Sequence, residues 1–157
     1  PRPERVLQIK EAQGLMTPVR DLGQGSVALY TVITEQRYAV ILITPDTQIA
    51  RDYAISAADL NRKVLTFRQA LQNPRIDPRP LAQELYQIPI APIEQELRGA
   101  QAQTLMWSLD GVLRYLPLAA LHDGKRYLVE RYRQVVFTPA SLTRLIAPLN
   151  RNGKAWA

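Results

Sequence analysis

The chain carries few of the residue types that perform covalent catalysis. It contains no cysteine, and His122 is its single histidine. A histidine can act as a general base only beside a nucleophile, and none of the four serines (Ser26, Ser56, Ser108 and Ser141) lies in a G-x-S-x-G elbow. Because His122 stands next to a tight turn, we expect it to hydrogen-bond backbone groups and to order that loop.

Two Asp-Gly pairs frame the same region. Asp110 and Asp123 could be interpreted as paired carboxylates for acid–base chemistry. The favoured interpretation is turn formation, because the glycines at 111 and 124 accept the positive φ that tight turns require.

Arg114 is a further candidate, since a guanidinium can bind a carboxylate or phosphate group of a substrate. It stands in a predicted strand, where an ion pair or a solvent-facing position is the favoured interpretation. The nearby aromatic residues are expected to pack in the core or across strands, with a peptide-binding groove as the alternative. They are Trp107, Tyr115, Tyr127 and Tyr132.

Composition excludes several classes of protein. The 157 residues, 46% hydrophobic and 22% charged, suffice for one globular domain with a core. The chain shows no transmembrane stretch or signal peptide, and the lack of cysteine fits a cytoplasmic protein. One histidine without cysteine also removes the usual zinc sites. We therefore predict no catalytic, metal-ligating or cofactor-binding residue within the chain, and no cofactor.

The net charge of +6 comes almost wholly from the last third of the chain, where residues 101–157 hold eight basic and three acidic groups. Nucleic-acid binding is one interpretation. A solvated basic face, or one that meets an acidic partner domain, is preferred because no aromatic–basic platform accompanies the charges. The basic residues are Lys125, Arg126, Arg131, Arg133, Arg144, Arg151 and Lys154, beside Arg114.

The first half of the chain predicts an antiparallel meander followed by helices. Three strands are expected over 26–34, 37–44 and 47–55, the second of them central. Ser56 then caps a helix with the apolar face Leu60, Val64, Phe67 and Leu71, which ends near residue 73. Further helices are expected after Asp77-Pro78 and after Pro92, up to Gly99.

The second half predicts mainly strands. A strand over 104–109 is expected to form a hairpin with 112–116 through Asp110-Gly111, followed by a short helical turn over 117–121. Residues 127–130 and 134–138 favour two more strands, and Ser141 is expected to cap a last short helix. Residues 6–16 favour the end of a helix, and the apolar end around Trp156 suggests the start of a strand. The chain, which begins with Pro1, is predicted to be a piece of a longer protein.

The segment Asp110-Gly-Val-Leu-Arg-Tyr-Leu-Pro-Leu-Ala-Ala-Leu-His-Asp-Gly124, followed by Tyr127-Leu-Val-Glu-Arg-Tyr132, resembles the CHAT family. CHAT domains are caspase-like and usually follow tetratricopeptide repeats. Weaker similarity extends over roughly residues 26–145. The resemblance implies an α/β fold, or α+β for an isolated half: an antiparallel meander, two or three helices, then strands that lead into a caspase-like sheet.

The resemblance also implies what lies elsewhere. The catalytic histidine of CHAT peptidases stands in a later His-Gly motif and the cysteine follows one strand on; neither motif occurs here. We therefore expect residues 1–25 to be the tail of a preceding segment and 26–157 the non-catalytic N-terminal part of such a domain. Its expected partners are the C-terminal peptidase half, the tetratricopeptide repeats and a regulatory protein. A non-enzymatic interaction module is the alternative, and enzymatic activity of the parent stays open.

Overall fold

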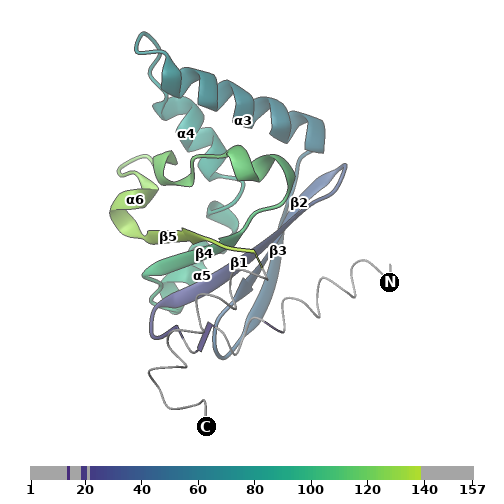
Figure 1. The fold of residues 1–157 in the computed structure, drawn as a ribbon, viewed down its shortest axis with the longest axis vertical. Coiled ribbons are helices and arrows are strands. Elements are labelled where there is room, and N and C mark those ends of the chain that lie inside the picture. The colour runs from purple at the N-terminus through teal and green to yellow at the C-terminus, as the bar shows by residue number, and fades with distance from the viewer. Residues whose placement is uncertain (1–13, 15–18, 21, 139–157) are drawn as a thin grey trace.

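The computed structural model describes residues 14, 19–20 and 22–138 (Figure 1). Their centre is a five-stranded mixed sheet in the order β3-β2-β1-β4-β5. The first three strands pair antiparallel, whereas β4 pairs parallel to β1 and β5 parallel to β4. The α/β fold class is confirmed. The strands are β1 (Ser26–Ile33), β2 (Arg37–Ile43), β3 (Gln48–Ala54), β4 (Thr104–Ser108) and β5 (Arg133–Val136).

The predicted meander is confirmed, and each of its strands pairs with the next one along the chain. β1 and β2 are rich in β-branched and aromatic residues, and the turn between them closes with a hydrogen bond from the Thr34 N–H to the Arg37 carbonyl at 2.8 Å. β2 lies inside the sheet, with Tyr38, Val40 and Leu42 fully buried. Strands adjacent in sequence are thus adjacent in the sheet.

The long helix α3 (Ala57–Gln72) begins at the predicted cap. The Ser56 hydroxyl accepts a hydrogen bond from the Asp59 N–H at 3.0 Å. Its buried face consists of Leu60, Val64, Phe67 and Ala70. Leu71, which was predicted on that face, is 41% exposed instead, because the small Ala70 meets the core after Phe67.

The shorter helices follow the predicted proline and aspartate signals. Before α4 (Arg79–Tyr86), the Asp77 carboxylate accepts a hydrogen bond from the Arg79 N–H at 3.0 Å. Pro92 lies in the 3₁₀ segment η1 (Ala91–Ile93), which continues into α5 (Glu94–Gly99). The predicted helical turn is η3 (Leu118–Ala120).

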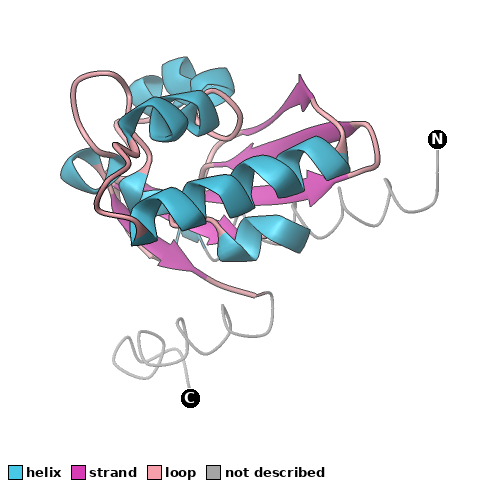
Figure 2. Cartoon of the chain, turned by 90° about the horizontal axis from the view of Figure 1, so that it is seen from above, coloured by secondary structure: helices cyan, strands magenta, loops and turns pink. Residues whose placement is uncertain are grey.

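The helices lie over one face of the sheet (Figure 2). This face and the helices share the main core, in which Phe67 and Trp107 are fully buried. Burial of each of these rings stabilises the fold by about 2–3 kcal/mol relative to exposure. A second, smaller cluster lies on the opposite face of the sheet and contains Ala28, Ile43, Met106, Phe137 and Val19.

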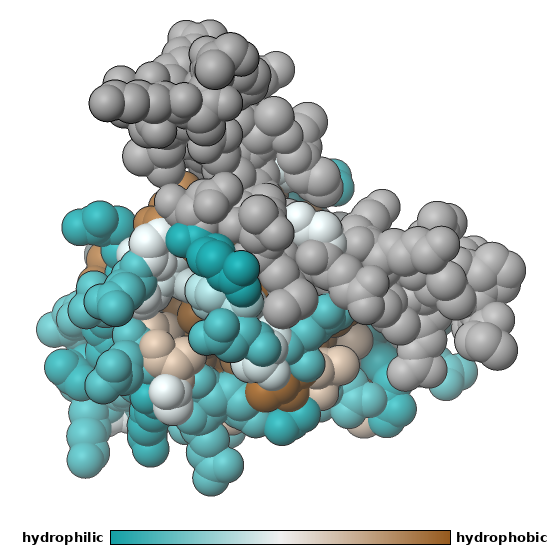
Figure 3. Space-filling view, turned by 90° about the horizontal axis from the view of Figure 1, so that it is seen from below, coloured by the Kyte–Doolittle hydropathy of each residue, from teal (hydrophilic) through white to brown (hydrophobic). Residues whose placement is uncertain are grey.

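Seen from below, the surface of the described residues is largely hydrophilic, with apolar side chains scattered between polar ones (Figure 3). Among the described residues, no helix combines the length and the apolar composition that crossing a membrane demands.

The predicted hairpin of residues 104–116 is wrong. Residues 111–115 form the 3₁₀ segment η2 (Gly111–Tyr115), and both neighbours of β4 are parallel strands. The Asp-Gly signal did identify a position of positive φ, since Gly111 has φ of 52°. The partner of β4 is distant in sequence, however, so the local turn pattern could not identify it.

The predicted strand 127–130 is also wrong, because these residues begin the short helix α6 (Leu128–Arg131). The Glu130 carboxylate accepts a hydrogen bond from the Tyr127 N–H at 2.7 Å, which is the second half of a capping box. The strand predicted at 134–138 is confirmed as β5. The helices expected over 6–16 and after Ser141, and the strand expected around Trp156, lie outside the described residues.

Tyr38 provides a test of this core. Its side chain is fully buried, and its hydroxyl has no hydrogen-bond partner among the residues that the structure describes. Burial raises the pKa of this hydroxyl far above its ordinary value, so it stays neutral. We expect Tyr38→Phe to leave the free energy of unfolding unchanged or to raise it by about 1 kcal/mol, as measured by urea denaturation.

The matched control is Tyr53→Phe. Tyr53 lies opposite Tyr38 on β3 and is 38% exposed, so its variant should match wild type. A loss of more than about 1 kcal/mol in Tyr38→Phe alone would contradict the prediction and indicate a hydrogen-bonded buried water.

Candidate functional site

β1 runs past the end of β4, and side chains replace the missing strand pairing there. The last pair between the two strands is Tyr30 with Ser108. Beyond it, the Thr31 hydroxyl donates to the Ser108 carbonyl at 2.6 Å and accepts from the Asp110 N–H at 3.0 Å. The Asp110 carboxylate accepts from the Ile33 N–H at 2.8 Å. Asp110 therefore satisfies the backbone of β1 and does more than form a turn.

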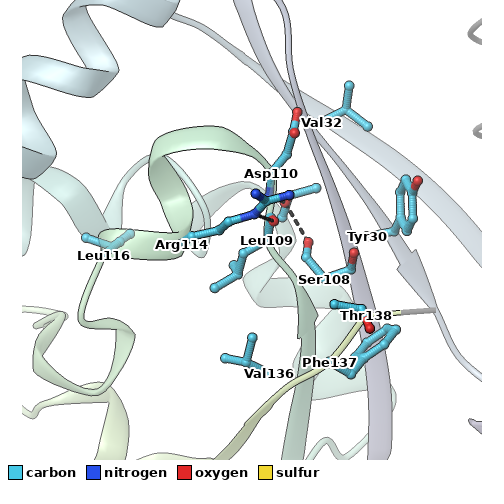
Figure 4. A pocket seen from close by; sticks show the side chains of 11 residues that line it. Tyr30, Val32, Ser108, Leu109, Asp110, Arg114, Leu116, Val136, Phe137 and Thr138 are labelled. Atoms are coloured by element: carbon cyan, nitrogen blue, oxygen red, sulfur yellow. Dashed lines mark hydrogen bonds between the residues drawn. The ribbon is translucent and has the colours of Figure 1, made fainter. Parts of the chain in front are cut away.

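An open pocket of about 440 Å³ lies at this end of the sheet (Figure 4). The chain leaves β1 toward β2 and leaves β4 toward β5, so the connections diverge between the two strands. Carboxyl ends of parallel strands at such a divergence are where open α/β sheets bind ligands. The lining residues are Tyr30, Thr31, Val32, Ser108, Leu109, Asp110, Arg114, Leu116, Val136, Phe137 and Thr138.

Arg114 lies on the rim of this pocket, on η2 and not in a strand as predicted. Its Nε donates to the Leu109 carbonyl at 3.2 Å, which fixes the guanidinium at the pocket (Figure 4). Within the described part of the chain, the terminal nitrogens of Arg114 and the hydroxyl of Ser108 have no partner. The pocket thus holds one cationic fork and one hydroxyl, both available to a ligand.

His122 lies elsewhere and has a structural role. It is 8% exposed, and its Nδ1 accepts a hydrogen bond from the Gly124 N–H at 2.9 Å. The ring meets Tyr127 edge-on, with centroids 4.8 Å apart, and the two residues form an isolated β-bridge. The expectation that His122 orders its loop through backbone groups is confirmed.

Asp123 forms the predicted turn and also a partly buried ion pair. Its carboxylate accepts hydrogen bonds from the N–H groups of Lys125 and Arg126, each at 2.7 Å, and pairs with Arg131 at 2.9 Å. Burial acts to raise the pKa of this carboxyl, but the two N–H groups and the Arg131 guanidinium lower it by more, so it lies below its ordinary value. Asp110 and Asp123 thus have separate partners and form no catalytic pair.

Arg131 connects this turn to the helices. Its guanidinium donates to the Tyr86 hydroxyl at 3.1 Å and lies over the Tyr132 ring, 5.2 Å from the centroid. The Tyr86 hydroxyl in turn bonds to Glu94. One basic group of the last third is therefore internal to the fold.

The aromatic residues divide between core and surface. Trp107 is fully buried, and its Nε1 donates to the Gln134 side chain at 3.1 Å; Tyr132 is also buried. Tyr115, in contrast, is 59% exposed, with Arg68 5.9 Å from its ring centroid. Core packing thus holds for two of the four predicted aromatics and fails for Tyr115.

Sequence reasoning missed the pocket itself. The sequence indicates Ser108 only as a potential nucleophile, and the incorrect hairpin gives Arg114 the wrong neighbours. The sequence signal that could have indicated the pocket is a hydroxyl residue at the end of β4, followed six positions later by an arginine. No three metal-ligating side chains cluster among the residues that the structure describes.

The Asp123–Arg131 pair yields a pH-dependent prediction. At neutral pH, Asp123→Asn keeps the turn acceptor but leaves Arg131 without its counter-ion, and should cost about 1–3 kcal/mol of unfolding free energy. Because the folded pKa of Asp123 is depressed, its contribution is complete above the unfolded value of about 3.9 and is lost as the pH falls through the folded pKa.

Urea denaturation of both proteins at neutral pH and near pH 3 measures this effect, and the difference should shrink at the lower pH. Asp52→Asn removes an exposed pair with Arg37 and is the control, expected to cost almost nothing at either pH. An equal loss in Asp123→Asn at both pH values would show that the ion pair is not the source.

Part of the chain, including strands that line the pocket, matches a known protein family. The model of the CHAT domain family matches residues 79–155, which include α4, the pocket strands β4 and β5, and the turn at Asp123. The comparison with curated proteins gave no match. Among solved structures, a chain of a PilM-PilN type IV pilus biogenesis complex is similar with a TM-score of 0.40 and 15% identity, over 85% of this chain and 42% of that one. The family match confirms, over residues 79–155, the resemblance to the CHAT domain family seen in the sequence.

Proposed function

We propose that this chain is the non-catalytic N-terminal part of a caspase-like cysteine peptidase domain, which braces the peptidase half by extending its own sheet into it. The observation that carries the proposal is the open outer edge of β5. Within the described residues β5 pairs only with β4, and it stands at the end of the sheet.

The backbone of β5 has donors available on that edge. The N–H groups of Arg133 and Phe137 donate inward, to the carbonyls of Gln103 and Trp107. Alternation along the strand therefore directs the N–H groups of Gln134 and Val136 outward. Val136 is 61% exposed, so an added strand can reach this edge. Unpaired edges of this kind recruit another strand.

The chemistry of the chain is consistent with a bracing role. No residue of the chain is a cysteine, and His122 is enclosed in its turn. A thiolate and its histidine partner would therefore have to come from the peptidase half, where the thiolate would attack a peptide carbonyl.

The alternative is a non-enzymatic interaction module, and the same open edge favours it. Such a module would use β5 to bind a strand from a signalling partner, with no chemistry in the assembly. The two proposals differ in the segment encoded after Ala157. A His-Gly motif followed by a cysteine at a strand end supports the peptidase, and their absence supports the module.

A proline on the edge tests the proposal directly. Val136→Pro removes an outward N–H and no bond within the sheet, so the chain should stay folded. We expect it to weaken binding to the downstream segment, produced as a separate polypeptide, by about tenfold or more. Calorimetry measures the binding, and circular dichroism checks the fold.

The matched control is Val136→Thr, which keeps the N–H group at the same position and should bind as wild type does. Full binding by Val136→Pro would refute sheet extension through β5. A folded chain that shows no binding to the downstream segment in any form would refute bracing altogether.

A further inference from the structure

We infer that the pocket between the ends of β1, β4 and β5 binds the carboxylate of an apolar amino acid residue, held by Arg114. The ligand carries a carboxylate and an adjacent N–H group on an apolar body. A free amino acid and the C-terminal residue of a peptide share this chemistry. The inference does not depend on β5 binding another strand.

The carboxylate specificity comes from the guanidinium of Arg114. Its Nε is bound to the Leu109 carbonyl at 3.2 Å, and this contact holds the planar group on the rim (Figure 4). The remaining N–H groups have no partner among the residues that the structure describes. A guanidinium with two free nitrogens matches the two oxygens of a carboxylate, and Ser108 adds a hydroxyl donor to the same wall.

The second charged group in the pocket, the Asp110 carboxylate, affects which anions can bind. Asp110 lines the same cavity and uses one carboxylate oxygen for the Ile33 N–H, which leaves the other as an acceptor. A doubly charged phosphate would be repelled by this carboxylate more strongly than a singly charged carboxylate. A ligand with an N–H donor beside its own carboxylate satisfies both Asp110 and Arg114.

Most of the other side chains that line the pocket are apolar, and they indicate that the ligand has an apolar body. Leu116 and Phe137 are buried, and Val136 is largely exposed on the side of β5. A volume of about 440 Å³ lies within the range of small-molecule sites and holds one or two residues. Few polar groups converging on an apolar cavity are the usual composition of a ligand site.

The test is a titration of the full chain with three small ligands, followed by NMR shifts of the backbone amides of residues 108, 114 and 137. Leucine carries a free ammonium, N-acetyl-leucine has the amide of a peptide C-terminus, and N-acetyl-leucinamide lacks the carboxylate. We expect millimolar binding of at least one of the first two and none of the third. Tighter binding of leucine indicates a free amino acid, and tighter binding of N-acetyl-leucine indicates a peptide C-terminus.

Arg114→Met should weaken the binding by about tenfold or more, because it removes charged hydrogen bonds from an exposed side chain that the fold does not need. Arg126→Met is the matched control, since Arg126 is also exposed but lies outside the pocket, and it should bind as wild type does. Absence of binding by both carboxylates, equal binding of the amide, or unchanged binding by Arg114→Met would each overturn the inference.

Discussion

The structure depends on β1 having two different neighbours over unequal lengths. β1 pairs with β2 along almost its whole length but with β4 only up to Tyr30. The backbone of its last residues would be left unsatisfied on one side, at a cost of about 1–3 kcal/mol for each buried group. The Asp110 carboxylate satisfies the Ile33 N–H of β1, and the Thr31 hydroxyl satisfies the Ser108 carbonyl and the Asp110 N–H at the end of β4. These contacts direct the chain away from β4 and over the end of the sheet.

The hydrogen bonds of Thr31 and Asp110 at the ends of β1 and β4 also position the pocket. The turn at Asp110 places η2 beside the carboxyl ends of the strands, and η2 carries Arg114. The same short segment positions Tyr115, whose carbonyl accepts a hydrogen bond from Arg68 of α3 at 2.8 Å. The pocket rim is thus held from the sheet at one end and from the long helix at the other.

The parts of the fold that the sequence predicted are those determined by neighbouring residues. The meander and α3 follow from strand propensity and from the Ser56 cap. The Asp110-Gly111 hairpin was mispredicted because the pairing of β4 depends on β1, which is far away in sequence, and turn chemistry contains no information on that. The strand predicted at 127–130 failed because Glu130 caps a helix and Arg131 bonds to Asp123, two contacts that outweigh β propensity. For the site, Arg114 was recognised as a candidate, but its surroundings required the distant contacts of β1 and β5.

The sheet order has a consequence for how the chain reaches this structure. The three antiparallel strands pair over short loops, whereas the Thr31–Ser108 contact joins residues 77 positions apart. Closing so long a loop costs entropy before any contact compensates it. During synthesis the meander can therefore form while β4 is still absent, and β1 must keep one edge open until the chain has grown past the helices. The polar side chains at the end of β1 thus also mark the place where the late half of the sheet has to find the early half.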